Sequence, residues 1–319
     1  MNIPIGIMAI VAAQRYIPFY RMGRGISLDV IGFITVIVGT SSLLSAFSQS
    51  NSWGWTDWKT ILLFVIGVLM IVYFIIRTLK VNDPLLNLRL FKIPRFTYSL
   101  ILNCTITISL YAGTFLIPIY MQKIQHASTL QTGLVMLPGT LAMALVSFFI
   151  GKVYNRVGPF RLILSGVVLM GLSTWALSRL SLTASTLFIT SWIAIRYIGI
   201  AMSNMPVTNA GMSSVPSEFS GQASAVMNWI RQGMSALSIS IFSTILSSQT
   251  LSYLKQAGSN DEATATWAMS LSIRHLFVIG TLLVVIALPL TFLIRKKEVV
   301  DEESLVKFLR NPREVGQLT

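Results

Sequence analysis

Eight runs of about 20 predominantly apolar residues follow one another along the chain, with short polar stretches between them. A helix rises about 1.5 Å per residue and the hydrocarbon core of a bilayer is about 30 Å thick, so each run is long enough to cross a membrane once. The pattern therefore predicts eight membrane-spanning helices. They are expected at Asp29–Ser48, Thr60–Leu79, Phe96–Met121, Leu130–Lys152, Phe160–Ser178, Ser185–Ala210, Gly221–Ser248 and Leu271–Ile294.

A ninth apolar run, Ile3–Ala13, is shorter. It reaches only about 17 Å at helical rise, which is less than a full crossing unless it continues through residues 14–19. A secretory signal would have basic residues before its apolar run, but here Arg15, Arg21 and Arg24 follow it. We interpret the run as a span that lacks its first part.

The composition supports this interpretation, because 54% of the 319 residues are hydrophobic and only 11% are charged, with a mean hydropathy of +0.71. Soluble domains carry about 25% charged residues. The expected fold class is an all-α polytopic membrane protein in the cell membrane. One cysteine, Cys104, and two histidines, His126 and His275, exclude a disulfide framework within the chain and a Cys/His metal cluster. No cofactor is expected.

The chain has a net charge of +13, and the positions of its lysines and arginines explain this excess. Seventeen of the 24 lie in the C-terminal tail or in and beside alternate gaps between the runs, five lie in or beside the opposite gaps, and Arg196 and Arg231 lie deep within runs. Because cytoplasmic loops retain cations, the richer set and the C-terminus are expected in the cytoplasm. The charge thus indicates topology and does not predict nucleic-acid binding.

Two shorter signals predict local architecture. Ser128 and Gln131 have the spacing of a capping box at a helix start. Gly199 and Ser203 form a small-xxx-small pair that permits close helix packing.

Between the fourth and fifth runs the chain reads GKVYNRVGPFR, from Gly151 to Arg161. The pattern predicts a tight basic turn reversed by Gly158 and Pro159. It resembles the signature loop of the major facilitator superfamily, in the version of the C-terminal half. Asn155 stands where that family usually has aspartate, which weakens a charge-pair switch. The resemblance assigns a conformational-switch loop to Gly151, Asn155, Arg156, Gly158 and Arg161.

The stretch that begins RYIGIAMSNMPVTNAG at Arg196 is more specific. It resembles the fourth and fifth helices of the C-terminal bundle in the 14-span drug:proton antiporter branch of the superfamily. Residues 2–6, NIPIG, with the following Ile7, resemble the sixth span of that branch, and Leu130–Pro138 resembles the start of the tenth. The resemblance implies a partial fold with four parts: a truncated span and loop (1–28), two linker helices and a loop (29–95), a six-helix bundle (96–294) and a cytoplasmic tail (295–319).

Proton coupling needs a titratable group inside the membrane, usually a carboxylate. All eleven aspartates and glutamates lie in loops, at span ends or in the tail. In the resembled family the coupling acids belong mainly to the first half. We therefore expect that this chain alone does not couple transport to protons.

Two cations lie deep in the expected spans, Arg196 and Arg231, each roughly 15 Å from the span ends. A charge facing lipid there costs several kcal/mol, so both are expected to face the protein interior or a watery cavity. Polar residues close to each arginine lie on the same face of its helix. The first helix of the expected six-helix bundle contributes weaker candidates. The candidate cavity residues are Arg196, Asn204, Asn228, Arg231, Gln232, Asn103 and Tyr111. A structural or gating role for each arginine, or snorkelling towards the membrane surface, is the alternative.

The leading hypothesis is the C-terminal portion of a multidrug efflux permease, truncated or the second piece of a split transporter. Its expected partners are a lipophilic or amphipathic small molecule, protons, the lipid bilayer and a separate N-terminal half-transporter. The alternative is a non-transporting membrane subunit or an inert remnant of a transporter gene. No nucleophile–base constellation or phosphate-binding glycine loop supports an enzyme.

Overall fold

The computed structural model describes residues 3–16, 29–81, 84, 86–258 and 261–295, and all regular structure in these ranges is helical. Eight of the helices, α2 to α9, are long and apolar enough to cross a membrane, which confirms the predicted all-α fold and its eight spans. The α-helices are α1 Ile3–Tyr16, α2 Val30–Trp53, α3 Trp58–Lys80, α4 Pro94–Ile119, α5 Thr129–Val157, α6 Pro159–Leu177, α7 Thr186–Met212, α8 Ser220–Ala257 and α9 Glu262–Arg295. Short helices η1 Leu88–Lys92, η2 Tyr120–Ile124 and η3 Ser217–Phe219 lie between them.

Four helix ends differ from the expected ones by more than a turn. Helix α2 continues to Trp53 instead of Ser48, α5 to Val157 instead of Lys152 and α8 to Ala257 instead of Ser248, and α9 begins at Glu262 instead of Leu271. A helix satisfies its own backbone hydrogen bonds in polar surroundings as well as in lipid, so the end of the apolar run does not end it. The end of α8 is set instead by Gly258, which is left-handed (φ +68°) and donates its N–H to the Leu254 carbonyl.

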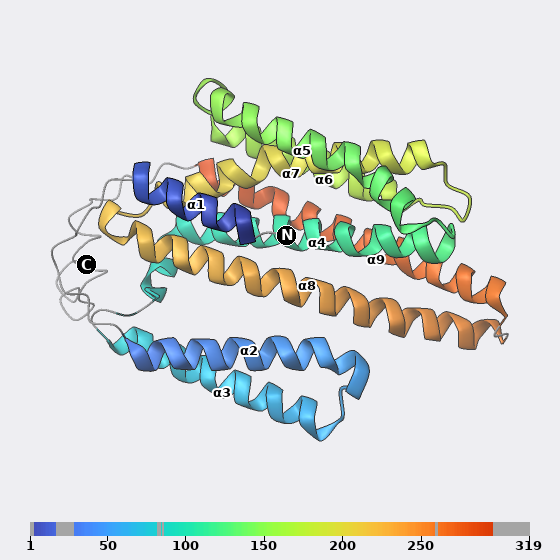
Figure 1. Ribbon diagram of the computed structural model, residues 1–319, viewed down its shortest axis with the longest axis horizontal. Coiled ribbons are helices and arrows are strands. Elements are labelled where there is room, and N and C mark those ends of the chain that lie inside the picture. The colour runs from blue at the N-terminus through green and yellow to red at the C-terminus, as the bar shows by residue number, and fades with distance from the viewer. Residues whose placement is uncertain (1–2, 17–28, 82–83, 85, 259–260, 296–319) are drawn as a thin grey trace.

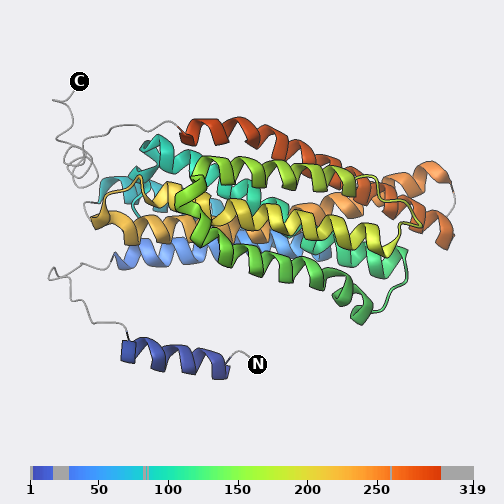
Figure 2. The same ribbon diagram turned by 90° about the horizontal axis from the view of Figure 1, so that it is seen from above.

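The helices α4 to α9 pack into one bundle (Figures 1 and 2). Helix α4 contacts α7, α8 and α9, while α7 also packs against α5 and α6, and α9 against α6 and α8. The α2–α3 hairpin lies along one side of this bundle, where α2 packs against α8 (Figure 1). The order agrees with the expected linker helices and bundle, but their division into domains stays a prediction.

Close approach of α6 and α7 depends on two glycines. A Cβ atom added to Gly199 would lie 2.6 Å from the Gly166 carbonyl oxygen and 2.8 Å from the Met170 nitrogen, so a larger residue does not fit. Ser203 donates its hydroxyl to the Gly199 carbonyl oxygen at 3.0 Å. The predicted small-residue packing of Gly199 and Ser203 is therefore confirmed.

The capping box is also confirmed. Ser128 accepts the Gln131 N–H at 3.2 Å, and the Gln131 side chain accepts the Ser128 N–H at 2.9 Å. The pair satisfies two backbone donors that the first turn of α5 cannot satisfy itself.

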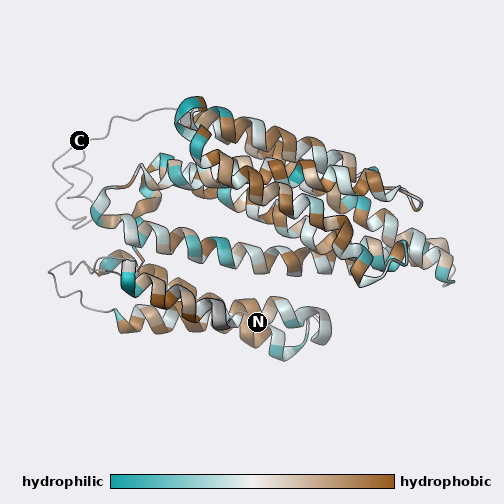
Figure 3. Cartoon of the chain, turned by 45° about the horizontal axis from the view of Figure 1, so that its top comes forward, coloured by the Kyte–Doolittle hydropathy of each residue, from teal (hydrophilic) through white to brown (hydrophobic). Residues whose placement is uncertain are grey.

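Apolar residues predominate along most of the long helices, and many of the polar residues lie towards helix ends (Figure 3). Leu130, Leu137, Leu145 and Phe148 of α5 and Leu69 of α3 are all exposed. A soluble domain would bury such residues, whereas helices that lie in lipid expose them at no cost. The surface is therefore that of a membrane-embedded bundle.

The short N-terminal run forms α1, which ends at Tyr16, three residues beyond the expected Ala13. Its 14 residues rise about 21 Å, still less than the thickness of the hydrocarbon core. Ile7, Met8, Ile10 and Val11 are each more than half exposed.

The connections alternate between the two ends of the bundle (Figure 1). The α3–α4, α5–α6 and α7–α8 connections lie at one end, and the α2–α3, α4–α5, α6–α7 and α8–α9 connections lie at the other. The first end carries the cation-rich gaps, so the described cations separate by end as the sequence predicts.

Arg89 binds the last turn of α3 at this cation-rich end. Its Nη2 donates to the carbonyl oxygens of Leu79 and Val81 at 3.2 and 3.0 Å. The residue is 4% exposed, and burial lowers the pKa of its guanidinium. A charged donor at a helix C-terminus satisfies carbonyls that have no partner within the helix.

Candidate functional site

Two of the predicted cavity residues, Asn103 of α4 and Asn204 of α7, meet inside the bundle. Asn103 Nδ2 donates to Thr208 Oγ1 at 3.1 Å and to Asn204 Oδ1 at 3.4 Å. Thr208 in turn donates its hydroxyl to the Asn204 carbonyl oxygen at 2.9 Å. Unpaired polar groups are costly where water is absent, so this mutual pairing lets three polar side chains sit within the spans. We define Asn103, Asn204 and Thr208 as the amide cluster.

A cavity of about 220 Å³ adjoins the amide cluster between α5 and α7. Its lining combines amides and hydroxyls with apolar groups and contains no charged side chain. The lining residues are Met143, Ser147, Ala201, Asn204, Met205, Thr208 and Asn209. Ligand sites usually measure about 300–1,000 Å³, so this cavity has room for part of a small amphipathic molecule.

A second polar group occupies the exposed side of α8. Arg231 Nη2 donates to Asn228 Oδ1 at 2.9 Å, and Gln232 is exposed beside them. Ser235 is buried and donates its hydroxyl to the Gln232 carbonyl oxygen at 2.7 Å. The structure thus places Asn228, Arg231 and Gln232 together, and we call them the α8 stripe; its part in transport stays a prediction.

Arg196 lies inside the packed bundle, with 1% of its surface exposed. Its Nη1 donates to Thr174 Oγ1 of α6 at 3.1 Å, and its Nη2 donates to both the carbonyl oxygen and the hydroxyl of Ser109 of α4. The guanidinium carbon lies 5.8 Å from the ring centroid of Phe277 of α9. One side chain therefore joins α7 to three neighbouring helices. This geometry favours a structural or gating role for Arg196 over cavity lining.

Gly113 makes room for this arginine. A Cβ atom at Gly113 would lie 3.0 Å from both Cζ and Nε of Arg196. The sequence interpretation missed Ser109, Gly113 and Thr174 as partners of Arg196, since small residues on separate spans carry no signal that they surround one cation.

Tyr111, the remaining bundle candidate, is not part of the amide cluster. Tyr111 is half-buried on α4, two turns or about 12 Å beyond Asn103. Thr107 is buried and donates its hydroxyl to the Asn103 carbonyl oxygen at 2.8 Å, a bond within its own helix.

The expected switch loop is not a loop, which corrects the sequence interpretation. Gly151, Asn155 and Arg156 belong to the last two turns of α5, and Arg161 belongs to the first turn of α6. Only Gly158 separates the two helices; its φ is +84° and its N–H bonds to the Tyr154 carbonyl oxygen at 3.0 Å. Pro159 then starts α6, because its fixed φ suits the first helical position and it has no N–H to satisfy. Asn155, Arg156 and Arg161 are exposed at this end.

Two larger hollows lie elsewhere along α5 and α7. One, of about 510 Å³, is almost wholly apolar and includes Phe149, Arg161 and Met202. The other, of about 660 Å³, is at the opposite end of the bundle and includes Gln125 and Gln131.

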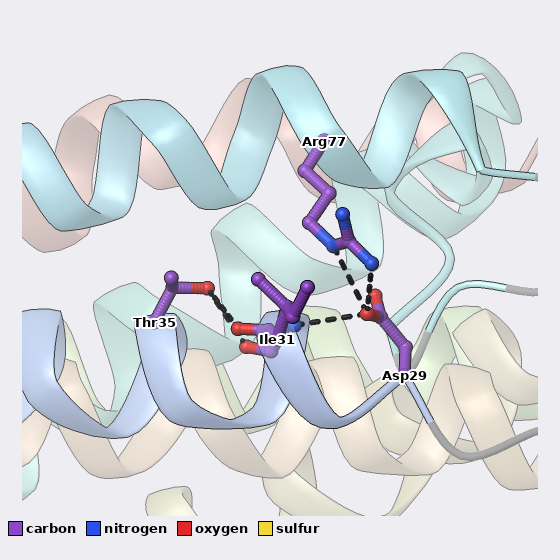
Figure 4. A network of polar contacts seen from close by, with 5 residues as sticks. Asp29, Ile31, Thr35 and Arg77 are labelled. Atoms are coloured by element: carbon purple, nitrogen blue, oxygen red, sulfur yellow. Dashed lines mark hydrogen bonds and ion pairs between the residues drawn. The ribbon is translucent and has the colours of Figure 1, made fainter.

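The α2–α3 hairpin is closed by an ion pair that the sequence interpretation also missed (Figure 4). Asp29 Oδ1 accepts Arg77 Nε at 3.0 Å, Arg77 Nη2 at 2.9 Å and the backbone N–H of Gly32 at 2.9 Å. Thr35 donates its hydroxyl to the Ile31 carbonyl oxygen at 2.8 Å one turn further along. Asp29 thus caps α2 and pairs with α3 at the same end of the bundle.

Comparison with known proteins gives a consistent set of relatives. Residues 4–239 match the Major Facilitator Superfamily. The uncharacterised MFS-type transporter YhcA of Bacillus subtilis is 34% identical over 254 residues, which cover 80% of this chain and 48% of YhcA. The lincomycin resistance protein LmrB of Listeria monocytogenes is 26% identical over 93% of this chain and 63% of its own length. The multidrug transporter protein MdtP of Bacillus subtilis is 27% identical over 78% and 46%. The chain spans about half to two thirds of the length of these relatives.

Proposed function

Because this chain belongs to the Major Facilitator Superfamily, we propose that it forms the C-terminal portion of a multidrug efflux permease. The permease would export lipophilic or amphipathic small molecules in exchange for protons. Relatives named for lincomycin resistance and for multidrug transport support the export of drugs.

The amide cluster and its cavity carry this proposal. Asn103, Asn204 and Thr208 hydrogen-bond to each other inside a bundle whose surface is apolar. Burying polar side chains within membrane spans is costly, so a cluster of them beside a cavity supports a substrate path. Amides and hydroxyls beside Met143 and Met205 suit a molecule that is partly apolar and forms a few hydrogen bonds.

We propose that proton coupling and alternating access both require a second bundle. Among the described acids, Asp29 and Asp57 cap helices at span ends and are not placed near the amide cluster. Rocking transporters bind substrate between two bundles that move against each other. The second bundle would then supply the other surface of the substrate path, facing the cavity and the α8 stripe.

The orientation is part of the proposal. The end that carries Arg77, Lys80, Lys92 and Arg156 would lie in the cytoplasm with the C-terminal tail, because cation-rich loops stay on that side.

Export by reconstituted protein tests the proposed function. The purified chain is placed in liposomes with a pH gradient and a lipophilic fluorescent dye, either alone or with the N-terminal spans of YhcA. We expect dye export driven by the gradient only when both parts are present. Gradient-driven export by the chain alone would refute the need for a second bundle. Absence of export from the assembled pair, with both parts shown to be inserted and associated, would refute the transport function.

A further inference from the structure

Helix α8 has two contrasting sides, and the α2–α3 hairpin touches one of them. Val226 and Ala223 are buried in a cluster shared with Val36 of α2 and Phe74 of α3, and Ile230 packs against that cluster. The α8 stripe occupies the other side, where Asn228, Arg231 and Gln232 are exposed. The hairpin therefore lies opposite the residues that we propose to face the substrate path.

Trp229 makes the directional contacts between the hairpin and α8. Its Nε1 donates to Thr40 Oγ1 of α2 at 3.0 Å. Its ring meets the ring of Phe74 of α3 edge to face, with the centroids 6.0 Å apart and the planes at 67°. The hydrogen bond and the ring contact fix the Trp229 side chain from two directions. Apolar packing alone has no such directional preference.

The exposed arc of α8 can be placed relative to Trp229, because each residue turns a helix by about 100°. Arg231 lies about 160° from Trp229 at one edge of the arc, and Ala225 lies about 40° from Trp229 at the other edge. Asn228 and Gln232 lie between these edges, and all four residues are exposed. Any rotation of α8 about its axis must therefore turn one edge outward and the other inward.

We propose that the α2–α3 hairpin fixes the rotation of α8, with Trp229 as the positioning residue, and thereby sets the direction of Arg231. An indole N–H inside a span has no water to bond, so Thr40 Oγ1 defines the position in which Trp229 is satisfied. The effect on transport rests on the proposed function, since it requires the α8 stripe to face the substrate path. The rotational position of α8 itself does not depend on transport.

Thiol reactivity at the two edges of the arc tests this role. Cys104 is first replaced by alanine, and then Arg231→Cys or Ala225→Cys is introduced alone into the full chain. The rate of reaction with N-ethylmaleimide is measured in detergent for each single-cysteine chain, with and without Thr40→Val. Thr40→Val keeps the shape of the side chain and removes the acceptor. Trp58→Phe, at a tryptophan that is 67% exposed, is the matched control for Trp229→Phe.

We expect Thr40→Val to change the two rates in opposite directions, each by about threefold, the size expected from one side-chain hydrogen bond in a membrane protein. Trp229→Phe should give the same pattern, Thr40→Val should add nothing to it, and Trp58→Phe should leave both rates unchanged. Unchanged rates, or rates that rise together, would overturn the proposal, because general loosening exposes both edges. Thr40→Val alone decides the matter if Trp229→Phe does not fold. These rates are independent of dye export, so this result and the test of transport can fail separately.

Discussion

At the scale of single residues, Arg196 shows how a cation is held in the spans by neutral partners. Two hydroxyls, a carbonyl oxygen and an aromatic ring surround its guanidinium. The arrangement requires a neighbour without a side chain at Gly113, where a Cβ atom would lie 3.0 Å from Arg196 Cζ. Arg196 and Gly113 therefore form one structural unit across α4 and α7.

Replacement of that glycine should destabilise the bundle. We expect Gly113→Ala to lower the free energy of unfolding by about 1–3 kcal/mol, because the guanidinium must shift and lose hydrogen bonds. Gly133→Ala is the control, since it lies on a helix with nothing within 4 Å of the added atom, and it should be neutral or stabilising by up to about 1 kcal/mol. Thermal unfolding in detergent measures both. Equal effects of the two variants would argue against the Arg196–Gly113 unit.

Arg231 is expected to act through its charge at the substrate path. With the N-terminal spans supplied, Arg231→Ala should reduce dye export by about tenfold and Arg231→Lys by less, because lysine keeps the charge but loses the planar donor fork that reaches Asn228. Both variants should insert normally, since the side chain is exposed. Initial export rates at matched protein levels provide the measurement, and full export by the alanine variant would remove Arg231 from the path.

At the scale of helices, the apolar runs predicted the existence and the order of all eight spans because hydrocarbon requires about 20 apolar residues per crossing. Helix ends were less predictable. Gly258 and Gly158 end their helices through positive φ angles, beyond the apolar runs that define α8 and α5. The motif from Gly151 to Arg161 looked like a loop because it is polar, yet polar residues extend a helix equally well outside the lipid.

Contacts between distant spans were the least predictable part of the candidate site. Asn103 and Asn204 could each be singled out as polar residues in apolar surroundings, but their hydrogen bond depends on the packing of α4 against α7. The Asp29–Arg77 pair was missed because each residue had another explanation, Asp29 as an acid at a span end and Arg77 as a topogenic cation. Opposite charges at the same end of consecutive spans are the signal that would have found it.

The Asp29–Arg77 pair should hold the α2–α3 hairpin closed. Arg77→Ala leaves the nearly buried Asp29 carboxylate without its cation, so we expect a loss of stability, kept small because Arg77 is partly exposed. Adding Asp29→Asn should restore part of that loss, since the neutral amide costs less to bury and its oxygen still accepts the Gly32 N–H. Urea-dependent proteolysis of the hairpin would report both variants. A double variant less stable than Arg77→Ala would show that the charge pair is not the source of the effect.

At the scale of the whole molecule, the two ends of the bundle differ in charge, and this difference predicts orientation. A reporter fused after Thr319 should be on the cytoplasmic side, and a reporter inserted at Gly258, at the opposite end of the bundle, should be external. Paired phosphatase and fluorescent-protein fusions in cells give the two locations. Reversed locations would invert the proposed topology without altering the fold.

We propose that the cavity beside the amide cluster is part of a drug-export path. Ser147 lines this cavity from α5, and Leu145, on the same helix, is not part of the lining and is 62% accessible on the apolar surface. Phenylalanine at position 147 would place a large ring at the rim of the 220 Å³ cavity, while phenylalanine at position 145 would add apolar surface to an apolar face.

The most direct measurement is the initial rate of dye export under a pH gradient by Ser147→Phe and Leu145→Phe chains, each assembled with the N-terminal spans in liposomes. The proposed path predicts that Ser147→Phe reduces export by about tenfold or more, since a blocked cavity cannot hold the dye, and that Leu145→Phe exports at the unmodified rate. Undiminished export by Ser147→Phe would contradict the claim.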